Sequence, residues 1–387
     1  MRIIKVVTGS DGGGVFTSER AFSSELRRQG HTVEGLIVGD GPSVRIYEDV
    51  FSRVMPVVTD FPRFDGTFSR KLVRFPQAIL KSRAVAREAG RTLDVSASET
   101  IVAVRKPILL PLAGQLAKRL GVPVVWHIPE TLSRFPKRPI FKYFCRKYNV
   151  VPIGNSRYTN EEMGFDDSPV VFPTFDPVSV LSDGRSLRGE LSIPEEVPVF
   201  GSAARLTYEK APDLVVRAFL QSRAFREGAY FLLAGGPLES ALGDELRLII
   251  DKEGNGQVHL LGVVREMANF YQTIDVAVNG RRDAEPFGIS IIEALASGKP
   301  VIAYRLGGPA QTIEDEVTGW HVTEPTVAGY LEGFDRAYAA ADRWAAMGQN
   351  GVKSVNVFNV ETQVSKYVEC ARDALDRRYS DERARKT

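Results

Sequence analysis

The stretch Glu285-Pro286-Phe287-Gly288-Ile289-Ser290-Ile291-Ile292-Glu293-Ala294-Leu295-Ala296-Ser297-Gly298-Lys299-Pro300-Val301-Ile302-Ala303 decides how the rest of the chain is interpreted. Its pattern predicts a turn on Pro286 and Gly288, followed by a helix whose apolar residues recur at helical spacing. Gly298 is the expected C-cap of that helix. An apolar strand from Val301 to Tyr304 follows directly.

Two acids in this stretch suggest a ligand. At about 1.5 Å per residue, the step from Glu285 to Glu293 covers roughly 12 Å, close to the span from the sugar to the ribose of a nucleotide sugar. Free N–H groups near Gly288 and Ile289 suit a diphosphate between them. The alternative is structural, with Glu285 a helix-start acid favoured by the dipole and Glu293 on a solvated helix face.

With its Pro-Phe-Gly turn and its Ala-Ser-Gly-Lys-Pro-Val-Ile-Ala tail, the stretch resembles the Glu-x7-Glu signature of retaining glycosyltransferases, particularly glycosyltransferase family 4 (group 1). The resemblance implies an α/β protein of the GT-B fold. In that fold two Rossmann-like domains face a cleft, and a C-terminal helix crosses back to the first domain. It also implies that Glu285 orients the donor sugar and that Glu293 holds the ribose.

Length and composition agree with a soluble globular protein of two domains. The 387 residues exceed what one hydrophobic core serves, and contents of 43% hydrophobic and 25% charged residues are ordinary for a globular protein. Cys145 and Cys370 lie far apart without metal-ligand spacing, which favours a reducing cytoplasm. The N-terminus shows no signal peptide and the chain no apolar run of about 18 residues, so no membrane span is expected.

The first domain begins as a doubly wound sheet. Strands are expected at Ile3–Val7 and Val33–Val38, with a glycine loop and an amphipathic helix between them. Gly13 and Gly14 in that loop are candidate binding residues, because glycine lets a phosphate or an acceptor sugar approach the backbone. A flexible turn is the alternative. The loop resembles the family's N-terminal glycine loop.

A histidine ends a later strand of this domain. The strand expected from Val122 to Ile128 places His127 at its carboxyl end, where α/β sheets bind ligands. It resembles the histidine that the family has near the donor sugar, and the resemblance implies a catalytic role. A structural histidine is the alternative.

The second domain carries a cationic pair. Arg205 and Lys210 follow the strand predicted at Val199 and resemble the Gly-Arg-Leu-x-x-x-Lys-Gly motif, whose two cations bind the donor diphosphate. Such cations stabilise the negative charge that the leaving nucleotide gains. Ala204 and Ala211 stand where the family has glycine. Further along, Arg281 and Arg282 stand where relatives often carry Pro-Ser; contact with an acceptor and simple solvation both remain open for them.

Domain boundaries follow from these motifs. Residues 1–175 are expected to form the acceptor-side domain, residues 176–365 the nucleotide-sugar domain, and residues 366–387 the helix and tail that return to the first domain. Residues 171–177 resemble the family's interdomain linker. Thr174 and Phe175 stand where the family has Asn-Gly.

Two basic and aromatic stretches lie in the first domain, one between Phe51 and Arg91 and one from Arg134 to Tyr148. Pro76 is expected to prevent one continuous helix in the first of them. Such mixtures bind anionic lipid or a charged acceptor, or they form a packed aromatic face with a solvated basic one. No nucleic-acid-reading motif accompanies them.

The sequence therefore predicts a cytoplasmic, retaining, hexosyltransferase-like enzyme that moves a sugar from a nucleoside-diphosphate sugar to a glycan or lipid-linked acceptor. No metal or other cofactor is expected, because no convincing Asp-x-Asp pair occurs. Peripheral contact with the inner face of the membrane is a further expectation. Two alternatives remain: a sugar-nucleotide epimerase of the same fold and a non-catalytic sugar-binding subunit.

Overall fold

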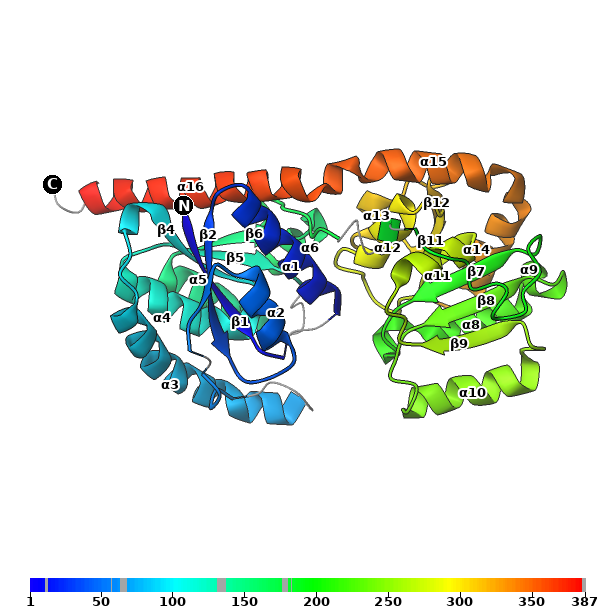
Figure 1. Cartoon of the computed structure of the whole chain (residues 1–387), viewed down its shortest axis with the longest axis horizontal. Helices are drawn as coiled ribbons and strands as arrows, with labels where there is room; N and C mark the ends of the chain where they lie inside the picture. The colour runs from blue at the N-terminus through cyan, green and yellow to red at the C-terminus, as the bar shows by residue number, and fades with distance from the viewer. Residues whose placement is uncertain are drawn as a thin grey trace. The chain divides into compact units, whose positions relative to one another are not determined.

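The computed structural model describes residues 1–10, 13–56, 58–62, 68–130, 137–175, 180–181 and 183–384. The chain forms two compact units (Figure 1). Unit 1 comprises Met1–Thr174 and Asn359–Thr387, and unit 2 comprises Phe175–Phe358. The first boundary lies one residue from the expected one, whereas the chain returns to unit 1 at residue 359 instead of 366.

Unit 1 is built on a six-stranded parallel sheet with the strand order β3-β2-β1-β4-β5-β6. Its strands are β1 Arg2–Thr8, β2 Thr32–Val38, β3 Arg53–Val54, β4 Thr100–Val104, β5 Val124–Ile128 and β6 Val150–Gly154. Its helices are α1 Gly13–Arg28, α2 Ser43–Val50, α3 Phe68–Thr92, α4 Leu110–Leu120, α5 Lys137–Tyr148, α6 Arg157–Met163 and α16 Val360–Ala384, with short 3₁₀ turns η1 Ala97–Glu99 and η2 Pro107–Leu109.

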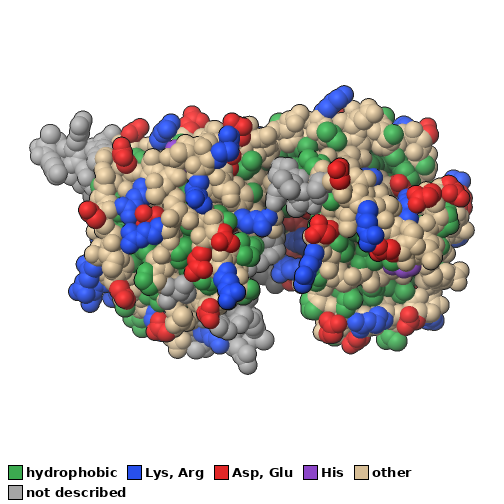
Figure 2. Space-filling view, in the orientation of Figure 1, with side chains coloured by type: hydrophobic (Ala, Val, Ile, Leu, Met, Phe, Trp, Pro, Cys, Tyr) green, Lys and Arg blue, Asp and Glu red, His purple; other side chains and the backbone are tan. Residues whose placement is uncertain are grey.

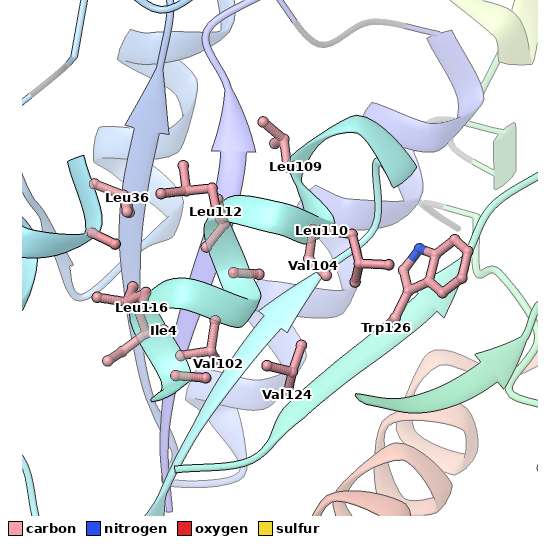
Figure 3. Packing of buried hydrophobic residues seen from close by; sticks show 14 of the residues in the cluster. Ile4, Leu36, Val102, Val104, Leu109, Leu110, Leu112, Leu116, Val124 and Trp126 are labelled. Carbon is pink, nitrogen blue, oxygen red and sulfur yellow. The ribbon is translucent and has the colours of Figure 1, made fainter. Parts of the chain in front are cut away.

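Alternation along β1 explains the two layers of helices in unit 1. Ile4 and Val6 face a core shared with α3, α4 and α5. Ile3 and Val7 face the opposite core, shared with α1, α2 and α16. Figure 3 shows the first of these cores, where side chains of β1, β2, β4 and β5 meet leucines of η2 and α4. Burial on both faces is the expected property of a parallel sheet.

The C-terminal helix α16 packs on unit 1 as expected. Val364, Tyr367, Val368, Ala371 and Leu375 recur at helical spacing and are buried against that unit's core. The Gln363 side chain also accepts a hydrogen bond from the Phe172 N–H at 2.9 Å, so the helix is tied to the segment by which the chain leaves the unit.

One helix prediction is wrong. Helix α3 runs without a break from Phe68 to Thr92 although Pro76 lies inside it. Pro76 is exposed, so water can hydrate the carbonyl that the missing N–H leaves unpaired. Apolar residues further along the helix, such as Ala78 and Val85, are buried in the core against α4. This packing outweighs the local cost of the proline.

Unit 2 repeats the same topology, with the strand order β12-β11-β10-β7-β8-β9. Its strands are β7 Val199–Ala203, β8 Tyr230–Ala234, β9 Val258–Gly262, β10 Val276–Asn279, β11 Val301–Tyr304 and β12 Gly319–Val322. Its helices are α8 Pro212–Gln221, α9 Arg223–Arg226, α10 Ala241–Glu253, α11 Met267–Thr273, α12 Ile289–Ala296, α13 Pro309–Thr312, α14 Val327–Ala339 and α15 Trp344–Ser354, with 3₁₀ turns η3 Tyr208–Lys210, η4 Ala341–Arg343 and η5 Val355–Phe358.

In each sheet the first strand lies beside the fourth, which is the Rossmann order 3-2-1-4-5-6. The expectation of two Rossmann-like α/β domains is therefore confirmed. In unit 2 the strand order reverses between β7 and β10, and ligands of such sheets bind outside the carboxyl ends of the strands at that point.

Candidate functional site

The candidate site is formed by the two loops that leave the switch point of unit 2. One loop follows β7 and carries Arg205 and Lys210, and the other follows β10 and carries Arg281 and Glu285. All four charged residues therefore come to the same edge of the sheet, although about 75 positions separate the two loops.

Lys210 and Glu285 form a direct ion pair, with the Lys210 Nζ 2.5 Å from the Glu285 Oε2. Lys210 ends η3, and Ala211 after it adopts a left-handed conformation with φ +48° before α8 begins. This conformation explains why glycine is the family's usual residue at that position. The alanine adopts it here while fully buried.

The backbone of Glu285 is fixed by the chain after β11. Its N–H donates to the Leu306 carbonyl at 3.1 Å, and its own carbonyl accepts from the Gly308 N–H at 2.7 Å. A Cβ on Gly307, whose φ is +90°, would lie 2.2 Å from the Glu285 carbonyl oxygen. Only glycine fits there, so the Gly-Gly of the sequence positions the carboxylate.

A second cation, Arg281, also faces Glu285. Its Nη1 lies 3.7 Å from the Glu285 Oε2, and both side chains are largely buried. Burial alone would raise the pKa of Glu285, but the positive charges of Lys210 and Arg281 and the hydrogen bonds from Lys210 and Asn279 outweigh it. The pKa is therefore lowered, and Glu285 is a carboxylate at neutral pH.

Arg282 connects the two loops to each other. Its guanidinium stacks on the Tyr208 ring at 4.0 Å, pairs with Asp213 and donates to the Tyr208 carbonyl at 2.7 Å. Arg281 and Arg282, for which solvation and acceptor contact were both open, are therefore paired within unit 2. Neither is a solvated surface residue.

Helix α12 starts at Ile289, three residues beyond Pro286. Gly288 precedes the helix in a left-handed conformation with φ +92°, and a Cβ there would lie 2.7 Å from the Ile291 Cδ1. The amides of Ile291 and Ile292 already donate to the Gly288 carbonyl at 2.9 and 3.4 Å, so the helix amides that have no acceptor within the helix are those of Ile289 and Ser290. They supply N–H donors and a positive dipole end beside the ion pair.

Because the helix begins only at Ile289, the rise of 1.5 Å per residue does not apply from Glu285 to Gly288. The helical rise assumed between the two acids therefore holds only from Ile289 to Glu293, because Pro286 and the left-handed Gly288 form a turn and Glu285 belongs to a bridge with Gly307.

Glu293 lies one turn into α12 and is half-buried. The Tyr271 hydroxyl donates to its Oε2 at 3.2 Å. Burial, the charge of Glu293 and this hydrogen bond raise the pKa of Tyr271 well above its usual range, so the phenol stays a donor. Glu293 is thus held in place by a hydrogen bond. It does not lie on a freely solvated helix face, as the structural alternative for this residue would require.

Arg205 differs from the other cations of the site. Its side chain is exposed, and within the described part of the chain it forms no ion pair. Arg205 and Lys210 are therefore not equivalent in this structure, because Lys210 is already paired with a carboxylate.

The remaining candidates belong to unit 1. Gly13 and Gly14 form the first turn of α1, while residues 11–12 of the glycine loop lie outside the described residues. His127 lies in β5 and is 4% exposed, with its Nε2 2.7 Å from the Val171 carbonyl oxygen. A carbonyl only accepts, so Nε2 carries the proton.

Burial, with the charges of Arg105 and Lys5, holds the pKa of His127 well below its usual value, although the bond to the Val171 carbonyl opposes this. The ring is therefore neutral at pH 7. It borders a small cavity that the buried Lys5–Glu19 ion pair also lines. A catalytic role for His127 stays a prediction.

Arg281 and Tyr330 were missed as site residues. Tyr330, on α14 and fully buried, has a hydroxyl that accepts from the Arg281 N–H at 2.7 Å and donates to the Arg281 carbonyl at 3.1 Å. For Arg281 the sequence offers one indication of a role in the site, which is that the arginine stands where the family often has Pro-Ser. Nothing local identifies Tyr330.

Residues 183–354, all within unit 2, match the family model "Glycosyl transferases group 1". A lipopolysaccharide 1,2-N-acetylglucosaminetransferase of Salmonella typhimurium is 30% identical over 166 residues, covering 41% of this chain and 44% of the relative. A D-inositol 3-phosphate glycosyltransferase of Saccharomonospora viridis is 24% identical over 404 aligned positions, covering 94% of this chain and 90% of the relative. The chain spans less than half the length of most of the first curated relatives it matches.

Solved structures that match nearly the full length of the chain have the same fold. A glycosyltransferase of Rickettsia africae superimposes with a TM-score of 0.78 at 18% identity, covering 97% of this chain and 98% of that one. Anabaena Alr3699/HepE in complex with UDP-glucose gives a TM-score of 0.74 at 19% identity, covering 95% and 99%. The chain has the GT-B fold.

Proposed function

We propose that this protein is a retaining glycosyltransferase of family 4 type that transfers a sugar from a nucleoside-diphosphate sugar to an acceptor. The observation that carries the proposal is the Lys210–Glu285 pair at the switch point of unit 2, whose carboxylate precedes the start of α12 by four residues. The family match to the same unit supports it.

In the proposed mechanism the leaving diphosphate is stabilised by this chain's own charges. Arg205, Lys210 and the amides of Gly288 and Ile289 face the phosphates, whose negative charge increases as the glycosidic bond breaks. The ionised Glu285 accepts hydrogen bonds from hydroxyls of the transferred sugar, and Glu293 accepts them from the ribose. The departing phosphate assists the acceptor hydroxyl on the same face of the sugar, which gives retention.

We propose that transfer needs no metal, because these groups neutralise the diphosphate themselves. Within the described ranges, no three His, Cys, Asp or Glu side chains are grouped as metal ligands. Addition of EDTA should therefore leave the initial rate of transfer unchanged, whereas a rate that falls and returns with Mg²⁺ or Mn²⁺ would contradict this part of the proposal.

Donor identity is tested first by thermal unfolding with UDP, GDP and ADP sugars. A ligand at 100 times its Kd stabilises by about 2.7 kcal/mol, which raises the Tm of a domain of this size by about 5 to 10 °C. The matching donor is then incubated with candidate acceptors, and the anomeric configuration of the product is read by NMR. Conversion of the nucleotide sugar without an acceptor would indicate the epimerase instead, and an inverted product would contradict retention.

For the acceptor we propose a glycan or lipid-linked precursor reached from the cytoplasmic face of a membrane. Among the described residues, none of the helices combines the length and apolar character that a membrane-spanning segment requires. Support comes from exposed apolar residues on α5 and α3: Tyr143 is 56% exposed beneath Lys147, and Leu80 is 66% exposed beside Lys81, which is itself paired with Asp60. Arg63, Phe64, Arg134 and Phe135 of the same stretches lie outside the described residues.

The face seen in Figure 2 carries basic and acidic side chains intermingled, so a membrane contact would involve a limited patch. Each Lys or Arg near an anionic leaflet contributes about 1 kcal/mol. Co-sedimentation with anionic vesicles at low salt, lost at high salt and lost with neutral vesicles, is the expected result. No sedimentation with anionic vesicles at low salt would favour a soluble acceptor.

A further inference from the structure

Two cations, Lys210 from the loop after β7 and Arg281 from the loop after β10, face the carboxylate of Glu285 in unit 2. The Glu285 Oε2 lies 2.5 Å from the Lys210 Nζ and 3.7 Å from the Arg281 Nη1. Lys210 is one of the residues that the proposed function assigns to the diphosphate. Once a diphosphate is bound, the positive charge of Lys210 is compensated by phosphate, and it no longer balances Glu285 alone.

Arg281 is held independently of Lys210. Its Nη2 donates to the Ala284 carbonyl at 2.7 Å and lies 2.5 Å from the Asp283 carboxylate. The Tyr330 hydroxyl binds the N–H and the carbonyl of Arg281 on the main chain. The guanidinium therefore keeps its place beside Glu285 whatever Lys210 binds.

Resting on the proposed function, we propose that Arg281 is a positioning residue that keeps the Glu285 carboxylate ionised and oriented toward the donor sugar when a diphosphate engages Lys210. A buried carboxylate without a counter-ion becomes protonated, and a protonated Glu285 accepts fewer hydrogen bonds from sugar hydroxyls. The charge of the diphosphate would add to that tendency. Arg281 opposes both effects.

Four side chains of the described residues act on this carboxylate. Lys210 reaches it from η3, Asn279 donates a hydrogen bond from the end of β10, Arg281 faces it from the loop after β10, and the Tyr330 phenol does so from α14. Asp283 and Glu209 lie next to Arg281 and set part of its surroundings.

The first test needs no substrate. In Lys210→Gln the neutral amide stands in for an ammonium already compensated by phosphate. The titration of the Glu285 carboxyl is followed by NMR in protein carrying ¹³C-labelled glutamate. The Glu285 signal is assigned as the one that is lost in Glu285→Gln. The titration is then recorded in Lys210→Gln, in Arg281→Gln and in the double variant. We expect a midpoint at or below the ordinary 4.5 in Lys210→Gln and above it in the double variant. A midpoint already above 4.5 in Lys210→Gln, unchanged by the second substitution, would overturn the proposal.

The second test uses the pH profile of transfer. In Arg281→Gln the acid limb of kcat should move to higher pH while the donor KM changes less than threefold, and Arg281→Lys should restore the wild-type limb. Arg217→Gln, which removes an exposed arginine of the same unit, should leave the profile unchanged. If Arg281→Gln weakens UDP binding as much as Lys210→Gln does and leaves the acid limb in place, Arg281 is a direct phosphate ligand and the proposal fails.

Failure of the proposed function is distinguishable from failure of this inference. Absence of transfer from every donor would defeat the proposed function and leave the Glu285 titrations as they stand. Should Arg281→Gln fail to fold, Arg281→Lys titrated in the Lys210→Gln background decides the point: a midpoint below 4.5 supports the inference, and a midpoint above it overturns it.

Discussion

Replacing Glu285 by glutamine should destabilise unit 2 and at the same time tighten its binding of a nucleoside diphosphate. The substitution keeps the shape of the side chain and removes the anion shared by Lys210 and Arg281. Breaking a buried ion pair by removing one partner costs about 3 to 5 kcal/mol. Because the Lys210 side chain is 19% exposed, we expect the lower end, about 3 kcal/mol at pH 7.

The same substitution removes a cost of binding. In the wild-type protein a diphosphate competes with Glu285 for Lys210, whereas in Glu285→Gln the ammonium is available from the start. Recovery of about half of the lost ion-pair energy, about 1.4 kcal/mol, lowers the Kd for UDP about tenfold. Turnover of the intact sugar nucleotide should nevertheless fall, because the carboxylate that accepts from the sugar is gone.

The effect on stability depends on pH in a defined direction. Burial raises the pKa of Glu285, but the charges of Lys210 and Arg281 and the hydrogen bonds from Lys210 and Asn279 lower it overall below its ordinary 4.5. Ionised Glu285 therefore stabilises the folded state fully above pH 4.5, and this contribution is lost as the pH falls through the lowered folded-state pKa. The difference between wild type and Glu285→Gln should be largest at neutral pH and should shrink below pH 4.5.

Hydrogen exchange of β10 and α12 followed by mass spectrometry measures the stability of unit 2 separately from unit 1, and calorimetry with UDP measures affinity. Glu245→Gln is the matched control, since its exposed partner Arg217 lies 3.2 Å away, and we expect a change of less than about 1 kcal/mol and an unaltered Kd. Weaker UDP binding in Glu285→Gln would refute the competition. An unchanged Kd would mean that Lys210 serves carboxylate and phosphate together.

Three further outcomes are expected. Arg205→Gln should change the free energy of unfolding by less than about 0.5 kcal/mol, because the side chain is exposed, yet raise the Kd for UDP at least tenfold; calorimetry showing equal affinity would remove Arg205 from the site. Glu293→Gln should raise the donor KM with little change in kcat, and the reverse in steady-state kinetics would mean that the donor lies the other way round. Ala211→Gly should lower the free energy of unfolding in urea by less than about 1 kcal/mol, because relief of the backbone strain at φ +48° offsets the loss of the buried methyl group. Ala218→Gly, inside α8, should lower it by about 2 kcal/mol, and equal losses in the two variants would contradict the strain at Ala211.

The sequence by itself determined the elements around the site. The apolar periodicity after Gly288 and the run at Val301 predicted α12 and β11, and the alternation of strands and helices predicted two parallel sheets. These features depend on residues close in the sequence, whose spacing directly sets which side chains are buried. For the same reason Arg205, Lys210, Glu285 and Glu293 could be chosen as candidates before any contact was known.

Tertiary structure decided which of those residues meet. Lys210 and Glu285 are 75 positions apart, and they pair because β7 and β10 are neighbours in the sheet. The same order brings Tyr330 under Arg281, where no local pattern indicates it. Packing against α4 also keeps α3 continuous through Pro76, against its local propensity. Partners distant in sequence are set by strand order and core packing, which short-range spacing does not encode.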